Sequence, residues 1–166
     1  ALLEDSQSRP MAHRAYRAHY PPGSVYKILV AAAALEEEVV TPETSYYCPG
    51  HFQLGGKGHR WRCWRRGGHG NVAMVDALAY SCDVYFYNVG LKLGVDKIAE
   101  WSNRFGLGVP TGLDLPGELP GLIPTREWKA ALHADQPVWE QRWYDGETVN
   151  LSIGQGDATT TPLQCA

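Results

Sequence analysis

The sequence contains no apolar run of about 18 residues, the minimum for a candidate membrane-spanning helix. It also lacks a strong charge imbalance, since 15 lysines and arginines stand against 18 aspartates and glutamates. The formal net charge of −3 therefore gives no reason to expect a polyanionic partner. Internal repeats and low-complexity tracts are absent as well. The chain has no initiator methionine and no signal peptide, so we interpret its 166 residues as a fragment whose targeting signals cannot be judged.

The length of 166 residues suits one domain or a piece of one, and the 44% hydrophobic content supports a packed core. Periodicity, caps and glycines predict helices at residues 24–39, 71–80, 84–93, 96–105 and 126–132. Another helix is expected to start at Thr161-Pro162. The buried stripe expected for the first helix consists of Val25, Ile28, Leu29, Ala32 and Leu35.

The remaining segments are predicted to be irregular or extended. Residues 1–19 are expected to form an extended lead-in, and residues 133–148 a surface loop. Residues 149–156 alternate like a strand that ends in a Gly-Gln-Gly turn. Residues 41–70 lack either periodicity, apart from a short strand at 52–54. A loop of this length is uncommon unless it has a function or is held by a cross-link such as a metal or a disulfide.

The first candidate for chemistry is Ser24, which follows a Pro-Pro-Gly turn at the start of the first expected helix. Lys27 lies three residues later on the same helical face, at roughly 5–6 Å between Cβ atoms. A hydroxyl, an amine and the positive end of a helix in one turn form a nucleophile, a base and a favourable field. The alternative is an ordinary helix cap followed by a lysine that extends to solvent.

The second candidate is the Ser81-Cys82-Asp83 connection between two expected helices. In an extended connection, residues two apart point the same way, so the Ser81 hydroxyl and the Asp83 carboxylate can converge on one site. The alternative is a helix-breaking serine and an aspartate that caps the next helix.

These motifs, in this order, resemble the penicillin-binding transpeptidases, and within them the class B enzymes of cell elongation. The resemblance covers nearly the whole chain. It rests on 20–27 (YPPGSVYK), 81–87 (SCDVYFY), 153–156 (IGQG) with Thr161-Pro162, 61–64 with 68–70, and 124–128. It implies an α+β penicillin-binding transpeptidase or serine β-lactamase-like fold, with residues 1–166 as part of a single transpeptidase domain.

The resemblance also implies a function: a peptidoglycan D,D-transpeptidase that cross-links stem peptides through a serine acyl-enzyme. Ser24 is then the nucleophile and Lys27 the base, Ser81 relays a proton, and Asp83 binds Lys27 or the substrate amide. β-Lactams acylate the same serine because they mimic D-alanyl-D-alanine, and no cofactor is required. The parent protein is expected to be membrane-anchored at the periplasmic face of the bacterial inner membrane, with a glycosyltransferase partner.

Two departures from the family pattern affect these expectations. Asp83 stands where most relatives have asparagine, although aspartate fits this subfamily. More importantly, no lysine is followed by serine or threonine and then glycine, so the third family motif is missing from these residues. The C-terminal strands of the central sheet go with that motif. We therefore expect a truncated, mostly helical portion of the fold that is inactive alone.

Cys48, Cys63, His69 and Cys82 form a third candidate site, because sulfur and imidazole suit tetrahedral Zn²⁺. A structural zinc would staple the long loop. The alternatives are a Cys48–Cys63 disulfide or unlinked thiols, with His51 and His59 as other nitrogen ligands. Cys165 is expected to be free.

Residues 57–66 interleave arginines with tryptophans, as single-strand nucleic-acid platforms do. We expect no nucleic-acid partner, because the overall charge is negative and no nucleic-acid fold motif is present. The alternative is arginine stacked on tryptophan within an ordered loop.

Two other function classes remain open at this stage. A β-lactam-hydrolysing enzyme or a β-lactam sensor shares the serine-x-x-lysine chemistry. A non-enzymatic scaffold piece of an elongation complex would use the fold only to bind partners.

Overall fold

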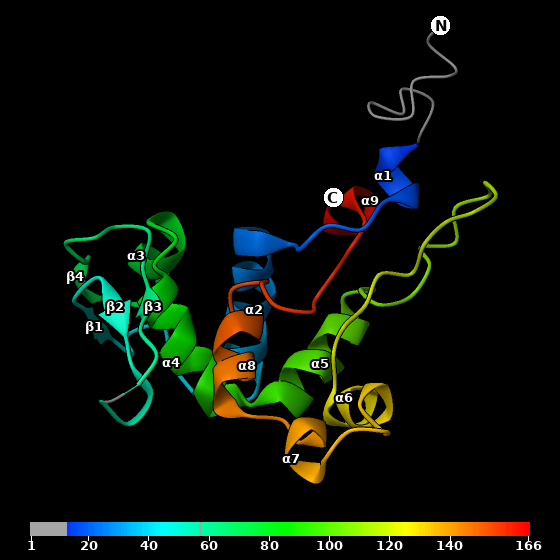
Figure 1. Ribbon diagram of the computed structural model, residues 1–166. Helices are drawn as coiled ribbons and strands as arrows, with labels where there is room; N and C mark the ends of the chain where they lie inside the picture. Colours follow the sequence, from blue (N-terminus) through cyan, green and yellow to red (C-terminus); the bar gives the residue numbers. More distant parts are fainter. Residues whose placement is uncertain (1–12, 57) are drawn as a thin grey trace, which may run out of the picture.

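The computed structural model describes residues 13–56 and 58–166. Most of the expected lead-in, and Lys57 of the arginine-rich segment, lie outside these residues. Within the described part, the lead-in includes a short helix, α1 (Arg14–Arg17), which was not expected. The last helix, α9 (Pro162–Cys165), lies beside α1, so the two ends of the described chain are neighbours (Figure 1). No helix in these residues is long and apolar enough to cross a membrane.

Helix α2 (Tyr26–Glu36) is the central element and follows a 3₁₀ turn, η2 (Gly23–Val25). Its buried face differs from the predicted one, since Val25 is 51% and Ile28 61% exposed. The residues that are buried instead include Tyr26, Lys27, Val30, Ala33 and Ala34. Periodicity could not select a face because the helix is apolar nearly all round. Tyr26 and Lys27 decide which face of α2 is buried, since the polar ends of both side chains find partners inside the protein.

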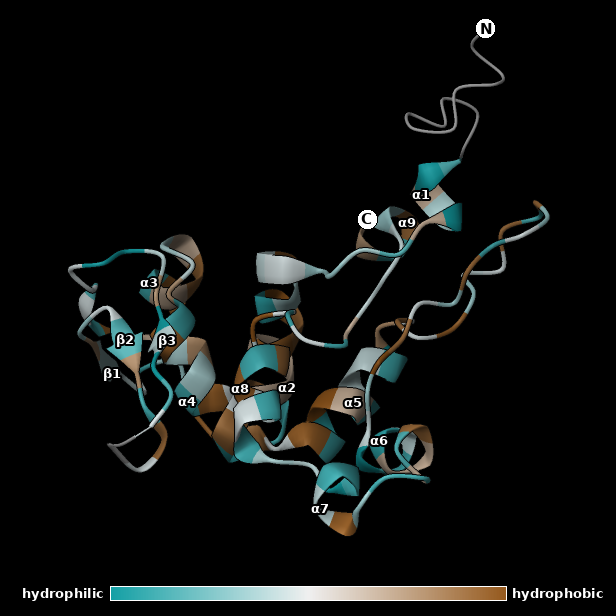
Figure 2. Cartoon of the chain, viewed as in Figure 1, coloured by the Kyte–Doolittle hydropathy of each residue, from teal (hydrophilic) through white to brown (hydrophobic). Residues whose placement is uncertain are grey.

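Three further helices surround this element: α4 (Asp83–Leu93), α5 (Val95–Arg104) and α8 (Asp145–Leu151). Helix α4 contacts α2, α5 and α8 (Figure 1). Brown, apolar segments of these helices face one another in Figure 2. Gly90 of α4 lies so close to α8 that a Cβ there would stand 2.3 Å from the Cβ of Ser152. Gly94, at φ +79°, makes the turn between α4 and α5.

The long loop is tied together by two small antiparallel sheets. Strand β1 (Tyr46–Cys48) pairs with β4 (Gly70–Val72), and β2 (His51–Phe52) pairs with β3 (Trp61–Arg62). A 3₁₀ turn, η3 (Leu54–Gly56), follows β2. A short strand therefore exists here, but at 51–52 rather than at the predicted 52–54, so the two share only Phe52. Helix α3 (Met74–Ala79) begins later than predicted, because its first expected residues form β4.

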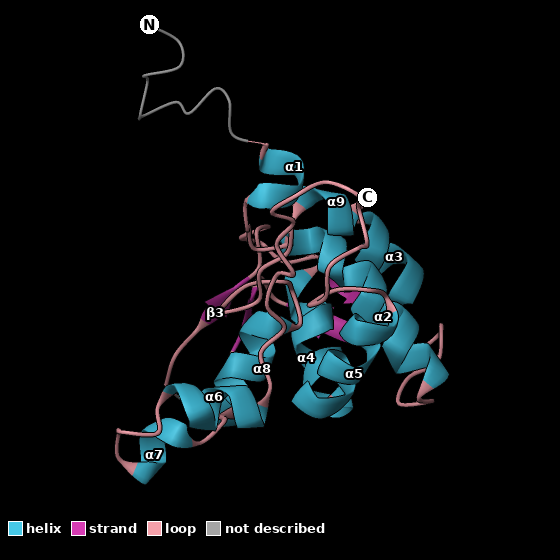
Figure 3. Cartoon of the chain, turned by 90° about the vertical axis from the view of Figure 1, so that its right-hand side faces the viewer, coloured by secondary structure: helices cyan, strands magenta, loops and turns pink. Residues whose placement is uncertain are grey.

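The C-terminal third is more helical than predicted. Helix α6 (Arg126–Leu132) has the expected bounds, and the Thr125 hydroxyl accepts the Trp128 N–H at 3.1 Å. The expected loop contains α7 (Val138–Gln141) and most of α8, and the strand predicted at 149–156 is wrong, because its start belongs to α8. Figure 3 shows α6 and α7 projecting from the other helices.

The segment after α8 holds the turn before α2 in place. The Gly23 N–H donates to the Gly154 carbonyl at 2.9 Å, and Tyr20 forms an isolated antiparallel bridge with Thr160. Gly154 has φ +69°, and a Cβ there would stand 2.4 Å from the Gly23 carbonyl oxygen. Only glycine allows this approach, which fixes the turn that carries Ser24.

Candidate active site

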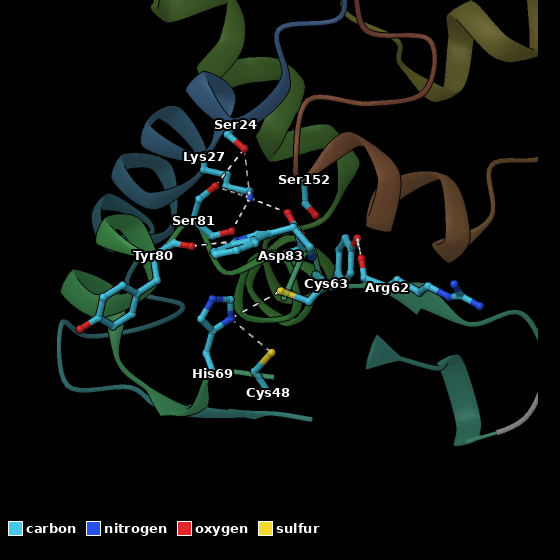
Figure 4. A network of polar contacts seen from close by, with 12 residues as sticks. Ser24, Lys27, Cys48, Arg62, Cys63, His69, Tyr80, Ser81, Asp83 and Ser152 are labelled. Carbon is cyan, nitrogen blue, oxygen red and sulfur yellow. Dashed lines mark hydrogen bonds and ion pairs between the residues drawn. The ribbon is translucent and has the colours of Figure 1, made fainter. Parts of the chain in front are cut away.

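Ser24 lies in the 3₁₀ turn before α2 and is exposed. Its hydroxyl does not cap the helix. Instead it accepts hydrogen bonds from Lys27 Nζ at 3.3 Å and from the Ser81 hydroxyl at 2.9 Å (Figure 4). The positive end of α2 lies directly behind it. The cap predicted as the alternative is therefore absent, and the serine presents its oxygen to two side chains of the site.

Lys27 is 2% exposed, so its amine does not extend to solvent. The Nζ atom donates to the carbonyl and hydroxyl oxygens of Ser81 at 3.0 and 2.9 Å. It also forms an ion pair with Asp83 Oδ1 at 2.6 Å, and the Phe86 ring centroid lies 5.9 Å away. A buried amine held by hydroxyl, carbonyl and carboxylate groups is fixed in position beside Ser24.

Ser81 adopts φ +51°, a left-handed conformation that is uncommon outside glycine. The extended geometry predicted for this connection is therefore wrong at Ser81, although its side chain and that of Asp83 still converge. Such strain of about 1–3 kcal/mol persists only where the surrounding structure enforces it, and it concentrates at functional sites. Here it directs both the carbonyl and the hydroxyl of Ser81 at Lys27.

Asp83 is the first residue of α4 and has a second contact that sequence reasoning missed. Its Oδ2 accepts the backbone N–H of Trp64 at 2.9 Å. The indole N–H of Trp64 donates to the Tyr80 carbonyl at 2.9 Å, so both ends of this residue are fixed. The motif containing Trp64 was recognised from the sequence. A backbone donor, however, leaves no trace in residue identity.

Cys48, Cys63, His69 and Cys82 lie close together, with their candidate ligand atoms all within 4.8 Å of one another. These residues lie in or beside the two small sheets and in the Ser81–Asp83 connection, so the cluster brings these segments together. His69 Nδ1 stands 3.7 Å from Cys48 Sγ and 3.5 Å from Cys63 Sγ (Figure 4). The structure thus brings together the four residues that the sequence selected.

Burial and contacts between its thiols determine the acidity of this cysteine cluster. The three thiols are buried, and no disulfide joins cysteines in the described residues. A hydrogen bond with Cys82 lowers the pKa of Cys63 to about 5, whereas the same contact and burial raise the pKa of Cys82. His59 packs edge-on against Trp61 and His51 pairs opposite Arg62, so neither belongs to the cluster.

The arginine-rich segment does not form the stacked arrangement considered for it. Trp61 is half-buried, and its indole N–H donates to Asn150 at 3.0 Å. Among the described residues, Arg60, Arg62, Arg65 and Arg66 have no cation–π contact; Arg104 stacks on Trp101 elsewhere.

Comparison with known proteins places the chain in a family. The model of the penicillin binding protein transpeptidase domain matches residues 3–166, so the chain belongs to that family. Peptidoglycan D,D-transpeptidase MrdA of Acinetobacter baumannii is 42% identical over 164 residues, which cover 99% of this chain and 24% of the relative. MrdA of Escherichia coli is also 42% identical over 164 residues, covering 99% of this chain and 25% of that relative. The chain thus spans about a quarter of the length of these curated relatives.

Solved structures agree with this assignment and with the expected α+β fold. The crystal structure of Pseudomonas aeruginosa PBP2 in complex with WCK 5153 has a TM-score of 0.89 and 44% identity, over 98% of this chain and 34% of that one. A complex between PBP2 and MreC from Helicobacter pylori gives a TM-score of 0.88 and 37% identity, over 98% and 29%. The predicted resemblance to class B enzymes of cell elongation is confirmed, and the similar solved structures are of penicillin-binding protein 2.

Proposed function

We propose that this chain carries the acylating centre of a peptidoglycan D,D-transpeptidase of cell elongation. The observation that carries the proposal is the direct contact of the Ser24 hydroxyl with both Lys27 and Ser81. Lys27 is the base that takes the proton from Ser24 Oγ, and Ser24 Oγ attacks the carbonyl of the penultimate D-alanine of a stem peptide. Asp83 holds the amine in position.

The reaction proceeds in two balanced steps: the ester forms at Ser24, and an amine then cleaves it. An ester forms at Ser24, the peptide C–N bond breaks, and the terminal D-alanine leaves after its nitrogen receives a proton through Ser81. Ser81 suits this relay because its hydroxyl lies 2.9 Å from both Lys27 Nζ and Ser24 Oγ. An amine of a second stem peptide then attacks the ester, forms the cross-link and returns the proton to Ser24.

One part of the active site, the second donor to the oxyanion, is not supplied by residues 1–166. The backbone N–H of Ser24 provides one donor to the oxyanion, and each such donor is worth about 10²–10³ in rate. The other donor in this family comes from the lysine-serine/threonine-glycine strand, which the 166 residues do not contain. Residues 1–166 are accordingly part of a single transpeptidase domain and are inactive on their own.

Labelling of the full-length parent protein with a fluorescent penicillin tests the proposal. Stable labelling that Ser24→Ala abolishes is expected. Rapid release of the label would instead indicate the β-lactam hydrolase. The scaffold alternative is tested in cells, where Ser24→Ala leaving growth and cell shape unchanged would contradict catalysis.

For the cysteine cluster, Cys48, Cys63, His69 and Cys82 are the ligands of a structural Zn²⁺. Three thiols and an imidazole are the donors that zinc prefers, and their close grouping supports this assignment over the disulfide. When bound, the metal supplies structural cross-linking and no chemistry. Elemental analysis is expected to give one zinc per chain. Absence of zinc, with all cysteines titratable, would exclude the site.

The same family membership supports a proposal about the location and the partners of the protein. The protein acts at the periplasmic face of the inner membrane, anchored there, and works beside a glycosyltransferase. A similar solved protein belongs to a peptidoglycan synthase complex that couples polymerization with crosslinking, which supports such a partner. Fractionation and affinity purification from the native cell test both statements.

A further inference from the structure

The arginine-rich segment is not used by the acylating centre, although it is the most basic part of the chain. Between Glu43 and Asp76 there is no acidic residue. The same stretch holds five lysines and arginines, which are Lys57, Arg60, Arg62, Arg65 and Arg66. In a chain of net charge −3, this is a local concentration of positive charge.

Three of these arginines line a groove beside the β2–β3 sheet. The groove has a volume of about 290 Å³, and its lining is Gly50, His51, Arg60, Arg62, Cys63 and Arg66. His51 is paired directly opposite Arg62 in the sheet register. Among the described residues, none of the three lining arginines forms an ion pair with a carboxylate.

Two glycines build this groove by letting two segments approach closely. A Cβ on Gly50, at φ +90°, would stand 2.2 Å from the Arg66 carbonyl oxygen. A Cβ on Gly68, at φ +76°, would stand 2.0 Å from the Cys48 carbonyl oxygen. The Cys63 N–H donates to the Gly50 carbonyl at 2.9 Å. The guanidinium groups are therefore carried by a closely packed backbone.

The groove adjoins the acylating centre without being part of it. Cys63 lines the groove, and the next residue, Trp64, donates its backbone N–H to Asp83. Figure 4 shows the Arg62 side chain directed away from Ser24 and Lys27. A ligand group in the groove is thus remote from the bond that Ser24 attacks.

We propose that this groove binds a carboxylate of the peptide substrate, at a position away from the scissile bond. The inference rests on the proposed function, because that function supplies a peptide as the substrate. Guanidinium groups bind carboxylates through paired, charge-assisted hydrogen bonds. The volume of about 290 Å³ is sufficient for a carboxylate group. Trp61 is packed against α8 and therefore gives the groove no stacking face for a base.

The test uses the protein expressed from its own gene, with binding followed by NMR of the arginine side chains. The probe is a synthetic peptide ending in D-alanyl-D-alanine that carries free side-chain carboxylates; its matched control is the same peptide with those groups as carboxamides. We expect Arg62→Gln or Arg66→Gln to weaken binding of the carboxylate peptide about tenfold or more. Arg142→Gln, an exposed arginine outside the groove, is the control variant and should bind normally.

Each other outcome has a defined meaning. Equal binding of the two peptides, or equal binding by the groove variants and the wild type, overturns the proposal. Arginine-dependent binding of inorganic phosphate or of anionic lipid vesicles, without the peptide, overturns it in favour of a phosphate ligand. Penicillin labelling of the wild-type protein is measured in parallel. Absence of labelling contradicts the proposed function, whereas the groove result is read separately from the NMR titration.

Discussion

At the scale of single residues, the ion pair between Lys27 and Asp83 holds the site together. The lysine side chain is 2% and the aspartate side chain 13% exposed, so both charges are largely removed from water. Removing one member of such a pair leaves the other buried and uncompensated. The same aspartate also fixes the loop around Trp64 through its second oxygen.

We therefore expect Asp83→Ala to lower the free energy of unfolding by about 3–5 kcal/mol, and Asp83→Asn by less, because the amide keeps an acceptor for Lys27. Urea denaturation measures both values. Asp114→Ala, at an exposed position, is the matched control. An Asp83→Ala protein with the wild-type midpoint and slope would show that the ion pair contributes nothing.

Much of the site could be predicted at this scale, but its geometry could not. Ser24, Lys27, Ser81 and Asp83 are recognisable because their residue types and spacing limit what they can do. The left-handed backbone at Ser81 has no sequence signal, since serine adopts it only under tertiary constraint. The backbone donor at Trp64 could not be predicted for a similar reason: every residue except proline carries the same N–H group.

A single carboxylate organises the turn at residues 111–118. Glu118 accepts hydrogen bonds from the hydroxyl and N–H of Thr111 and from the N–H groups of Gly112 and Leu113. The hydroxyl of Thr111 is the main cause that lowers the pKa of Glu118 below its ordinary value of 4.5. The turn is thus held by the ionised form of one side chain.

The sign of the pH effect follows from that lowered pKa. The contribution of Glu118 is fully present above the ordinary pKa of 4.5, and it is lost as the pH falls through the lower value of the folded state. We expect the amide signals of Gly112 and Leu113 to shift together on acidification below pH 4.5, and to be shifted already at neutral pH in Glu118→Gln. NMR titration measures this. Signals that stay unchanged to the acid limit would contradict it.

At the scale of elements, the two threonine caps gave correct helix starts, whereas apolar periodicity did not give the buried face of α2. Thr125 and Thr161 start α6 and α9 as predicted, because a threonine cap acts locally. The face of α2 was wrong because an all-round apolar helix has no periodic preference. Helix α8 was missed because its start is polar and its N-cap is Tyr144, an unusual residue for that position.

The contact of α4 with α8 depends on the absence of a side chain at Gly90. A Cβ there would stand 2.3 Å from Ser152 Cβ and 3.1 Å from its Oγ. We expect Gly90→Ala to destabilise the fold by about 1–3 kcal/mol through overpacking, despite the better helix propensity of alanine. Gly67→Ala is the control, since nothing lies within 4 Å of its Cβ. Chemical denaturation of both variants measures the difference, and equal stability would contradict the close packing.

At the scale of the whole molecule, the cysteine cluster connects parts that are far apart in the sequence. Cys48 ends β1, Cys63 follows β3, and Cys82 lies between Ser81 and Asp83. The two small sheets have few residues of their own to bury. A metal at the cluster would therefore fix both the long loop and the strained connection that presents the Ser81 hydroxyl to Lys27.

Removal of the metal should accordingly weaken stability and acylation together. A loss of about 4 kcal/mol, well below the binding free energy of structural zinc sites, corresponds to a fall in Tm of about 8–16 °C for a domain of about 150–250 residues. We expect a zinc chelator to cause such a fall and to slow penicillin labelling of Ser24, with both effects reversed by added zinc. Cys165→Ser, outside the cluster, should behave as wild type. An unchanged Tm and unchanged labelling after chelation would contradict this coupling. The Ser81–Asp83 connection would then be held by packing alone and not by a metal at the cluster.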